Sequence, residues 1–332
     1  MIIRSFGWRD LPLLYRYRDR GLFLDSARVL LHGDILIPAG AFLTFLGPTT
    51  RIFTYYCEKD SQSSLPLIGQ VTYVLGTTYA RLSFLAPENE MEMSDLAALS
   101  DYMASEMGKR GLFHILADID ESSPVYHLLR RSGFAIYARQ RIWCLKGNPS
   151  DDADAVSWRT SKSMDIIGAR SLYSNVVPGM VQQVESLPKK SLKGIVHYQN
   201  GELRAYIELK YGRNGIWAQP FVHPDAQDFD RYLGQLLLSL PKRRNRPIYI
   251  CVRSYQSWLE AAIEALGAQP GPQQALMVRH LTVARRIKQA YPLPAINGTR
   301  AEPTAPISRV IEQNRLLELS ETEGHPRSNS VV

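Results

Sequence analysis

Cysteine is scarce in this sequence. Cys57, Cys144 and Cys251 are the three cysteines among 332 residues, and an odd, widely separated set cannot build a disulfide framework. Their spacing matches neither a metal site nor a redox motif, and the histidines likewise lack metal-ligand spacing. Cys144 and Cys251 lie in apolar runs typical of buried thiols. The sequence therefore argues against a disulfide-stapled secreted protein and predicts no metal site.

Long hydrophobic runs are also missing. The longest apolar stretch, Ile35–Leu46, contains Pro38 and Gly40 and is shorter than the roughly 20 residues that cross a membrane. The first ten residues, MIIRSFGWRD, have no apolar core of the signal-peptide kind. We therefore expect a soluble, cytoplasmic protein without a membrane partner.

No extreme of composition or charge marks the chain. Hydrophobic residues make up 45% and charged residues 21%, as in ordinary globular proteins. The net charge of +7 permits an anionic ligand, but the basic clusters are small and are not interleaved with aromatic residues, as a stacking surface for nucleic acid would be. We expect these clusters, Arg16–Arg20, Lys242–Arg246 and Arg285–Lys288, to be solvated surface, and nucleic-acid binding is not favoured.

A strand–helix–strand unit is present twice. The stretch Leu112–Leu145 has an apolar run, a helix opened by Ser122 or Ser123 with Pro124, a stop at Gly133 and a second strand. The stretch Pro247–Val283 repeats this pattern, with its stop at Gly267. The two glycines are 267 − 133 = 134 residues apart, and the same shift places Leu116 on Ile250 and Leu129 on Ile263. A period this long indicates two copies of a domain rather than a solenoid.

Chain length agrees, since 332 residues are enough for two domains. We predict a first domain over 1–147, a polar, acidic linker over 148–155, a second domain over 156–284 and a flexible, proline-containing tail over 285–332.

Local patterns predict the other elements. In the first half we expect an edge strand (Met1–Phe6), a helix capped by Asp10 (Leu11–Arg18), a second helix (Leu22–His32), two strands (Ile35–Cys57), strands with a bulge near Gly76 (Ile68–Ala86) and a third helix (Ser94–Lys109). In the second half we expect a strand (Val156–Arg159), a helix (Asp165–Tyr173), three strands (Ile195–Gln199, Leu203–Lys210 and Ile216–Val222), a second helix (Phe229–Leu240) and a closing strand (Ala275–Val283). The pair Asn200-Gly201 predicts a tight hairpin turn.

This order of elements resembles the GNAT superfamily of N-acetyltransferases. The segment LLRRSGF (Leu128–Phe134) resembles the Leu-Tyr-x-x-x-Gly-Phe close of such a domain. The segments ARLSFLAP (Ala80–Pro87) and WAQPFVHP (Trp217–Pro224) resemble its central strand. The resemblance implies an α/β fold with a mixed sheet: two GNAT-like acyl-CoA N-acyltransferase domains in tandem, followed by the flexible tail.

The resemblance also implies a coenzyme A site that this sequence has altered. Glycines that bring backbone amides to the pyrophosphate are missing from ENEMEMS (Glu88–Ser94) and from DAQDFD (Asp225–Asp230), where carboxylates would repel it. By resemblance, acetyl-CoA or another acyl-CoA would contact backbone near the central strands and one helix start. The implied cofactor-binding residues are Leu85, Ala86, Ser94, Phe221 and Val222.

The catalytic residues are less defined. The tyrosine of many family members falls at Leu129 and Ile263, and the asparagine that often begins the last helix falls at Ser122 and Gln256. Glu208, His223 and Tyr137 are our candidates for proton transfer. Each also has a structural reading: an outward strand residue, a hydrogen-bonded loop residue and a core-edge aromatic.

Three hypotheses follow. The first is an N-acyltransferase that moves an acetyl or acyl group from coenzyme A to an unidentified small-molecule or protein amine. The second is a catalytically degenerate tandem GNAT that binds a ligand or partner. The third, a polyanion binder, rests on the basic clusters.

Overall fold

The computed structural model describes residues 1–17, 19–33, 50–58, 66–146, 158–187, 191–226, 233–234, 236, 240 and 246–281. Met1–Ala284 forms one compact unit, which contains every described residue. The tail, the linker, the strand predicted near Ile35 and most of the helix predicted at Phe229–Leu240 lie outside the described residues.

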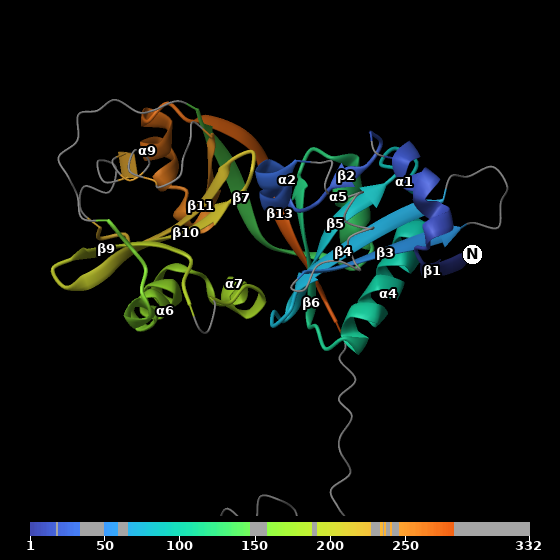
Figure 1. Ribbon diagram of the computed structural model, residues 1–332, viewed down its shortest axis with the longest axis horizontal. Helices are drawn as coiled ribbons and strands as arrows, with labels where there is room; N and C mark the ends of the chain where they lie inside the picture. The colour runs from blue at the N-terminus through green and yellow to red at the C-terminus, as the bar shows by residue number, and fades with distance from the viewer. Residues whose placement is uncertain are drawn as a thin grey trace, which may run out of the picture. The chain divides into compact units, whose positions relative to one another are not determined.

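One large mixed sheet organises the compact unit (Figure 1). Its strands follow the order β1-β3-β4-β5-β6-β13-β7-β12-β11-β10-β9-β8, with β2 paired to β5. Their bounds are β1 Ile2–Ser5, β2 Leu22–Phe23, β3 Thr50–Glu58, β4 Leu67–Val74, β5 Tyr79–Ala86, β6 His114–Asp120, β7 Ala135–Leu145, β8 Arg159–Thr160, β9 Gly194–Gln199, β10 Glu202–Tyr211, β11 Ile216–Val222, β12 Ile248–Arg253 and β13 Gln269–His280.

The strand order reads the same from either end once β13 is matched to β7. Antiparallel pairs flank a parallel pair, β5 with β6, in the first half and another, β11 with β12, in the second. The last strands are exchanged, because β13 lies between β6 and β7, and β7 lies between β13 and β12. Figure 1 shows these two long strands crossing the middle of the sheet together. The halves therefore share a single hydrogen-bonded sheet.

Helices cover both faces. The first half has η1 Trp8–Asp10, α1 Leu11–Arg16, α2 Ser26–His32, α4 Met93–Lys109 and α5 Pro124–Arg131; the second has η2 Ser163–Asp165, α6 Ile166–Val176, α7 Gly179–Val184, η3 Ser254–Gln256 and α9 Leu259–Ala265. Figure 1 shows α9 and the pair α6–α7 on opposite faces of the second half. The core beneath α6 and α7 includes Leu116, Leu276 and Phe221, and so draws on strands of both halves.

The duplicated unit confirms the 134-residue shift. Leu116 pairs in parallel with Arg81, and Ile250 pairs in the same way with Ala218. Both turn glycines have positive φ, +95° at Gly133 and +79° at Gly267, which a residue with a Cβ rarely adopts. In the first copy, Ser123 caps α5 through a bond from the Val125 amide, as the sequence predicts.

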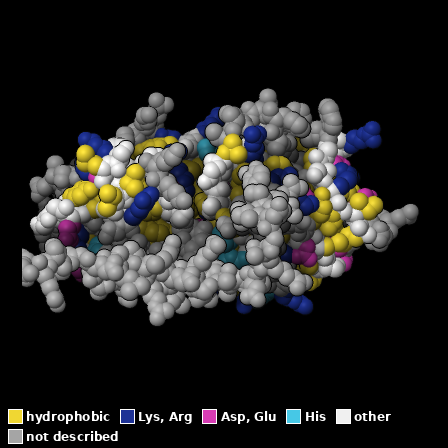
Figure 2. Space-filling model, turned by 90° about the horizontal axis from the view of Figure 1, so that it is seen from below, with side chains coloured by type: hydrophobic (Ala, Val, Ile, Leu, Met, Phe, Trp, Pro, Cys, Tyr) yellow, Lys and Arg dark blue, Asp and Glu magenta, His cyan; other side chains and the backbone are white. Residues whose placement is uncertain are grey.

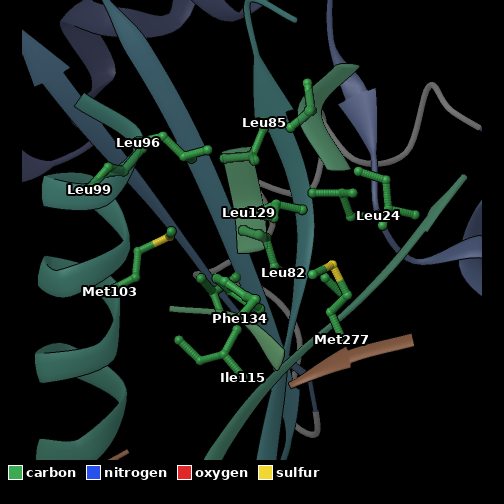
Figure 3. Packing of buried hydrophobic residues seen from close by; sticks show 14 of the residues in the cluster. Leu24, Leu82, Leu85, Leu96, Leu99, Met103, Ile115, Leu129, Phe134 and Met277 are labelled. Atoms are coloured by element: carbon green, nitrogen blue, oxygen red, sulfur yellow. The ribbon is translucent and has the colours of Figure 1, made fainter. Parts of the chain in front are cut away.

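The first-half core packs α4 and α5 onto the sheet (Figure 3). Leucines and methionines at helical spacing on α4 meet strand side chains and the buried Leu129 of α5. The residues labelled in the figure are at most 3% exposed: Leu24, Leu82, Leu85, Leu96, Leu99, Met103, Ile115, Leu129, Phe134 and Met277.

Several predicted elements need correction. Gly76, with φ +91°, lies in the turn between β4 and β5, and the bulge occurs instead where Gln70 and Val71 face β5. The helix predicted from Leu22 begins at Ser26, because the preceding residues pair with β5. The closing strand begins at Gln269, six residues earlier than predicted, through an irregular stretch that contains two prolines. The sequence did not predict the short helix α7.

The sequence predicts that Asp10 caps a helix, but its side chain makes no capping bond. Its carboxylate instead accepts two bonds from Arg4 and one from the Gly7 amide. Asp165 does the same with Arg159 and the Lys162 amide. Each pair spans six residues, and the two are 165 − 10 = 155 residues apart. We call this repeated arrangement the entry clamp, because it fixes the chain where an edge strand turns into the first helix.

Within the described residues, we find no helix that is both long enough and apolar enough to cross a membrane.

Candidate functional site

Each half of the sheet opens at its parallel strand pair. β5 pairs with β6 over three residues, ending at Arg81 and Leu116, although β5 continues to Ala86 and β6 to Asp120. β11 pairs with β12 over three residues, ending at Ala218 and Ile250, and both strands again continue. We call the places where the strands part the first fork and the second fork. The same opening therefore occurs once in each half of the shared sheet.

The chain fills the first fork with its own backbone. β2 pairs with β5 (Leu22 with Leu85, and Phe23 with Phe84). The next residue, Leu24, donates its amide to the Ser83 carbonyl at 3.1 Å and accepts the Asp118 amide at 2.9 Å. Leu24 thus joins the two separated strands, and its side chain is fully buried near Leu82 and Leu85 (Figure 3).

This arrangement bears on the predicted cofactor residues of the first half. Leu85 pairs with Gly69 of β4 on one side and Leu22 of β2 on the other, and Ala86 pairs with Ile68. A bound arm cannot pair with the Leu85 backbone unless β2 leaves. Ser94 does not cap its helix, because α4 begins at Met93 and the Ser94 hydroxyl contacts the Asp95 carboxylate. The geometry therefore argues against coenzyme binding in the first half.

The second fork is bordered by the free edge of β11. The His223 amide bonds to Arg204 on β10, so the alternation of a strand turns the peptide groups of Val222 toward the fork. The Val222 carbonyl accepts a bond of 3.1 Å from Nε2 of Gln256, a residue 1% exposed. Pro220 fits this edge because it has no amide to pair. Among the described residues, no main-chain bond bridges this fork beyond Ala218 and Ile250.

Gln256 was not among the predicted site residues, although the resemblance aligns it with the family's helix-start asparagine. Its Oε1 atom is buried and has no hydrogen-bond partner within the part of the chain that the structure describes. An unsatisfied buried acceptor costs free energy, so this atom suits a ligand that donates a hydrogen bond.

Ionised side chains meet where the two forks open on the face covered by α6 and α7. Glu185, which follows α7, accepts bonds from Arg253 Nη2 at 2.8 Å and from the Tyr137 hydroxyl at 2.6 Å. Arg81 lies 3.6 Å from Glu185 and donates to Asp118 at 3.2 Å. We call these five residues the branch cluster. They come from β5, β6, β7, β12 and the end of α7, so the exchanged sheet assembles them.

Burial and pairing set the protonation of this cluster. Burial alone would raise the pKa of Glu185, but Arg253 and Arg81 hold that pKa below its usual value. Burial raises the pKa of Asp118 despite the neighbouring Arg81. Burial and the adjacent Glu185 raise the pKa of Tyr137 well above 10, so its phenol stays protonated at neutral pH. Glu185 is thus a weak base, Asp118 a better one, and Tyr137 a possible proton donor.

Arg253 is the most buried cation of the cluster and is not fully paired. The residue is 4% exposed, and its Nε and Nη1 atoms are buried without a hydrogen-bond partner. The Arg81 side chain, at 23% exposed, and the Glu185 side chain, at 16%, are more open.

The predicted catalytic residues fall in three different places. Tyr137 belongs to the branch cluster. Glu208 lies on β10 beside Lys210, at 3.6 Å. His223 follows the outer end of β11, where its Nδ1 accepts the Asp225 amide. The structure therefore brings one of the three candidates to the forks.

Sequence reasoning missed the rest of the cluster. Arg81, Asp118 and Arg253 are charged residues inside or at the end of apolar strand runs, a signal of partnered buried charge that the sequence does offer. Glu185 gave no signal, because its loop follows a helix that was not predicted. Cys251, as expected, is a buried thiol; burial raises its pKa to about 12, so it is not a nucleophile at neutral pH.

Comparison with known proteins gave matches at the level of structure. Neither the family models nor the curated proteins gave a match. A GCN5-related N-acetyltransferase from Sphaerobacter thermophilus aligns over 84% of this chain and 95% of its own, with 11% identity and a TM-score of 0.51. A tandem GNAT protein from the clavulanic acid biosynthesis pathway aligns over 84% and 98%, with 16% identity and a TM-score of 0.47.

A putative acetyltransferase from Pyrococcus horikoshii aligns over 85% of this chain and 90% of its own, with 12% identity and a TM-score of 0.46. Identities this low establish architecture and not chemistry. The forked sheets, the duplicated strand order and the Sphaerobacter alignment together show that this chain has the fold of the GCN5-related N-acetyltransferases, present twice in tandem.

Proposed function

We propose that the protein is an N-acyltransferase that binds one acyl-coenzyme A per chain, in the second fork. The observation that carries the proposal is the contrast between the forks. Leu24 bridges the first with main-chain bonds, whereas the second presents the edge of β11 at Val222. The named structural relatives are acetyltransferases, which makes acetyl-CoA the first donor to test.

The residues of the second fork fit the chemistry of the pantetheine arm. That arm is extended and carries two amides, so it can pair with a strand edge much as the backbone of Leu24 pairs in the first fork. The Val222 peptide would hold one amide of the arm, and the unpaired Oε1 of Gln256 would accept an amide hydrogen. Phe221, packed between Tyr173 and Tyr206, would support this edge without touching the arm through its own peptide.

The coenzyme supplies an activated thioester, and side chains of the protein must transfer the protons. In the overall reaction an amine nitrogen bonds to the acyl carbon, the carbon–sulfur bond breaks, the amine loses a proton and the thiolate gains one. Asp118, whose pKa is raised, suits the role of base, and the Tyr137 hydroxyl suits that of acid. Both lie in the branch cluster, on the face from which an acceptor would approach.

Calorimetry with acetyl-CoA and the full chain tests the proposal. We expect one site per chain, measured with protein at about 100 µM so that binding as weak as ~10 µM is resolved. Gln256→Leu should weaken binding roughly 3- to 10-fold, the cost of one hydrogen bond. Ser122→Ala is the matched control, because Ser122 holds the equivalent position beside the filled fork; it should leave the affinity unchanged.

Three outcomes would contradict the proposal: no heat of binding, two sites per chain, or a loss of affinity in the Ser122 variant instead of the Gln256 variant. The first would reject coenzyme binding. The others would place the coenzyme in the first fork or in both.

A second candidate function is a ligand-binding module without turnover. It is favoured by Leu129 and Ile263, which occupy the family's tyrosine position in both halves and are fully buried among apolar residues, where no proton can be delivered. A thiol-release assay with a panel of amines separates the two candidates: binding without release supports the module, and release supports the transferase.

A further inference from the structure

We propose that Arg253 binds a carboxylate of the acceptor, so that the acceptor is an amino acid or another small carboxylate-bearing amine. The inference rests on the proposed function and adds a substrate class to it. It starts from an imbalance in the branch cluster: one guanidinium nitrogen of Arg253 bonds to Glu185, while its Nε and Nη1 atoms have no hydrogen-bond partner among the described residues.

The burial of Arg253 makes this imbalance significant. The residue is 4% exposed, so water cannot freely solvate the two unpaired N–H groups. A buried donor without a partner destabilises the fold, and more so when it is charged. A fold would carry this cost without benefit unless the groups are satisfied when a ligand binds. An anionic oxygen is the partner that restores most of it.

The neighbouring charges select the kind of anion. Glu185 already bonds to Arg253, and Asp118 lies beyond it on Arg81. A phosphate, with nearly two negative charges, would be repelled by these carboxylates, whereas a carboxylate adds one charge. Arg81 is shared between Asp118 and Glu185, so two guanidinium groups already face two carboxyl groups, and a singly charged anion adds less repulsion than a phosphate does.

The position of Arg253 fits an acceptor better than a donor. It is the last residue of β12, three residues beyond the end of strand pairing at Ile250, and it contacts Glu185, which follows α7. The opposite face of this strand pair packs against α9. A carboxylate held by Arg253 would therefore lie on the α7 side of the second fork, where the amine of the same molecule can face the thioester and the Tyr137 hydroxyl.

A thermal-shift screen of the full chain, without coenzyme, tests the inference. The probes are the common α-amino acids, each paired with its carboxamide, which keeps the amine and side chain but removes the carboxylate charge. We expect at least one amino acid at 10 mM to raise the Tm by roughly 2 °C or more, while its amide gives no shift, because a ligand that binds the folded state stabilises it by mass action.

Substitutions assign the effect to the guanidinium. Arg253→Gln should abolish the shift and Arg253→Lys should keep part of it, since the charge remains. Arg139→Gln is the matched control: Arg139 is an arginine of β7 with an exposed ion pair to Glu121, outside the cluster, and its variant should keep the full shift. Acetyl-CoA calorimetry on each variant shows that the second fork is intact and tests the proposed function separately.

The inference is overturned if no amino acid raises the Tm, if an amide does so as well as its acid, or if Arg253→Gln keeps the shift. If Arg253→Gln does not fold, the Arg253→Lys variant decides. Carboxylate recognition is rejected if, in this variant, the amino acid and its carboxamide both raise the Tm as much as the amino acid does in Arg139→Gln. Coenzyme binding that persists alongside any of these results leaves the proposed function standing.

Discussion

At the scale of single residues, the two entry clamps show how burial changes the value of the same bonds. The Asp165 side chain is 0% exposed and that of Asp10 is 10% exposed, beside arginines that are 39% and 45% exposed. Asp165 also accepts a bond from the Tyr198 hydroxyl. We expect Asp165→Asn to lower the free energy of unfolding by about 2–3 kcal/mol, because it leaves charged donors with a neutral partner. Asp10→Asn, the matched control, should cost about 1 kcal/mol or less.

The clamp also predicts an acid dependence. Hydrogen bonds from Arg159, the Lys162 amide and the Tyr198 hydroxyl hold the pKa of Asp165 far below its usual value, although burial acts to raise it. A depressed carboxyl pKa stabilises the folded state above the unfolded pKa of about 4, and this stability is lost as the pH falls below that value. The loss is completed only as the pH falls through the lower folded-state pKa, so urea unfolding should separate wild type from Asp165→Asn less at pH 3 than at pH 7. An equal separation at both would contradict this assignment.

Prediction from sequence succeeded at residues with a local signal. Ser123, Gly133 and the Asn200-Gly201 turn follow from capping and from positive φ, which depend on a few neighbouring residues. The branch cluster was not predicted, apart from Tyr137. Its members are distant in the chain, and nothing local distinguishes a charge that meets a partner from one that faces water.

At the scale of elements, long periodic segments were predicted and short ones were not. The helix α4 has leucines and methionines at regular helical spacing, whereas α7 has six residues and depends on packing over strands of the other half. β2 has two residues and exists because the first fork offers it a free edge. Their formation is decided by tertiary contacts, which propensity does not record.

A histidine pair joins the exchanged strand β13 to β6 of the first half. His114 of β6 and His280 of β13 are directly opposite, with Nδ1 atoms 3.2 Å apart and rings edge to face. Tyr79 of β5 is the register neighbour of His114. Two imidazoles this close can share a hydrogen bond only while at least one is neutral.

Acid should therefore weaken this contact. Burial and His280 lower the pKa of His114, so the unfolded chain binds a proton at higher pH than the folded chain does, and stability falls as the pH drops below about 6.5. We expect the wild-type Tm to fall more than that of His280→Gln between pH 7.5 and 5.5, by roughly 2–4 °C. His32 and His197 also have lowered pKa values and remain in both proteins, so identical pH profiles would reject the role of the pair.

At the scale of the whole molecule, no local pattern foretold the exchange of β7 and β13. The sequence shows two similar units, but it does not say with which half each last strand pairs, since both choices bury the same apolar faces. For the surface, the sequence predicts that the basic clusters are solvated and do not form a polyanion site. On the face in Figure 2, the described lysines and arginines are scattered among apolar and acidic side chains, which gives little support to polyanion binding.

The shared sheet predicts cooperative unfolding. Leu82→Ala, in the first-half core, should cost about 2–5 kcal/mol, and Ile250→Ala, in the second, a similar amount. Four of the five tryptophans follow residue 142, so fluorescence reports mainly on the second half. We expect both variants to lower one common Tm, seen alike by fluorescence and circular dichroism. A fluorescence transition that Leu82→Ala leaves in place would show that the halves unfold independently.

The exchanged strands also indicate an origin for the duplicated fold. A strand order that reads alike from both ends is what a symmetric homodimer displays when each subunit lends its last strand to its twin. Joining two such subunits end to end would give this topology without breaking a single inter-strand bond. Once fused, the copies no longer had to stay identical, so the first fork could be filled by the backbone of Leu24 while, among the described residues, no main-chain bond came to bridge the second.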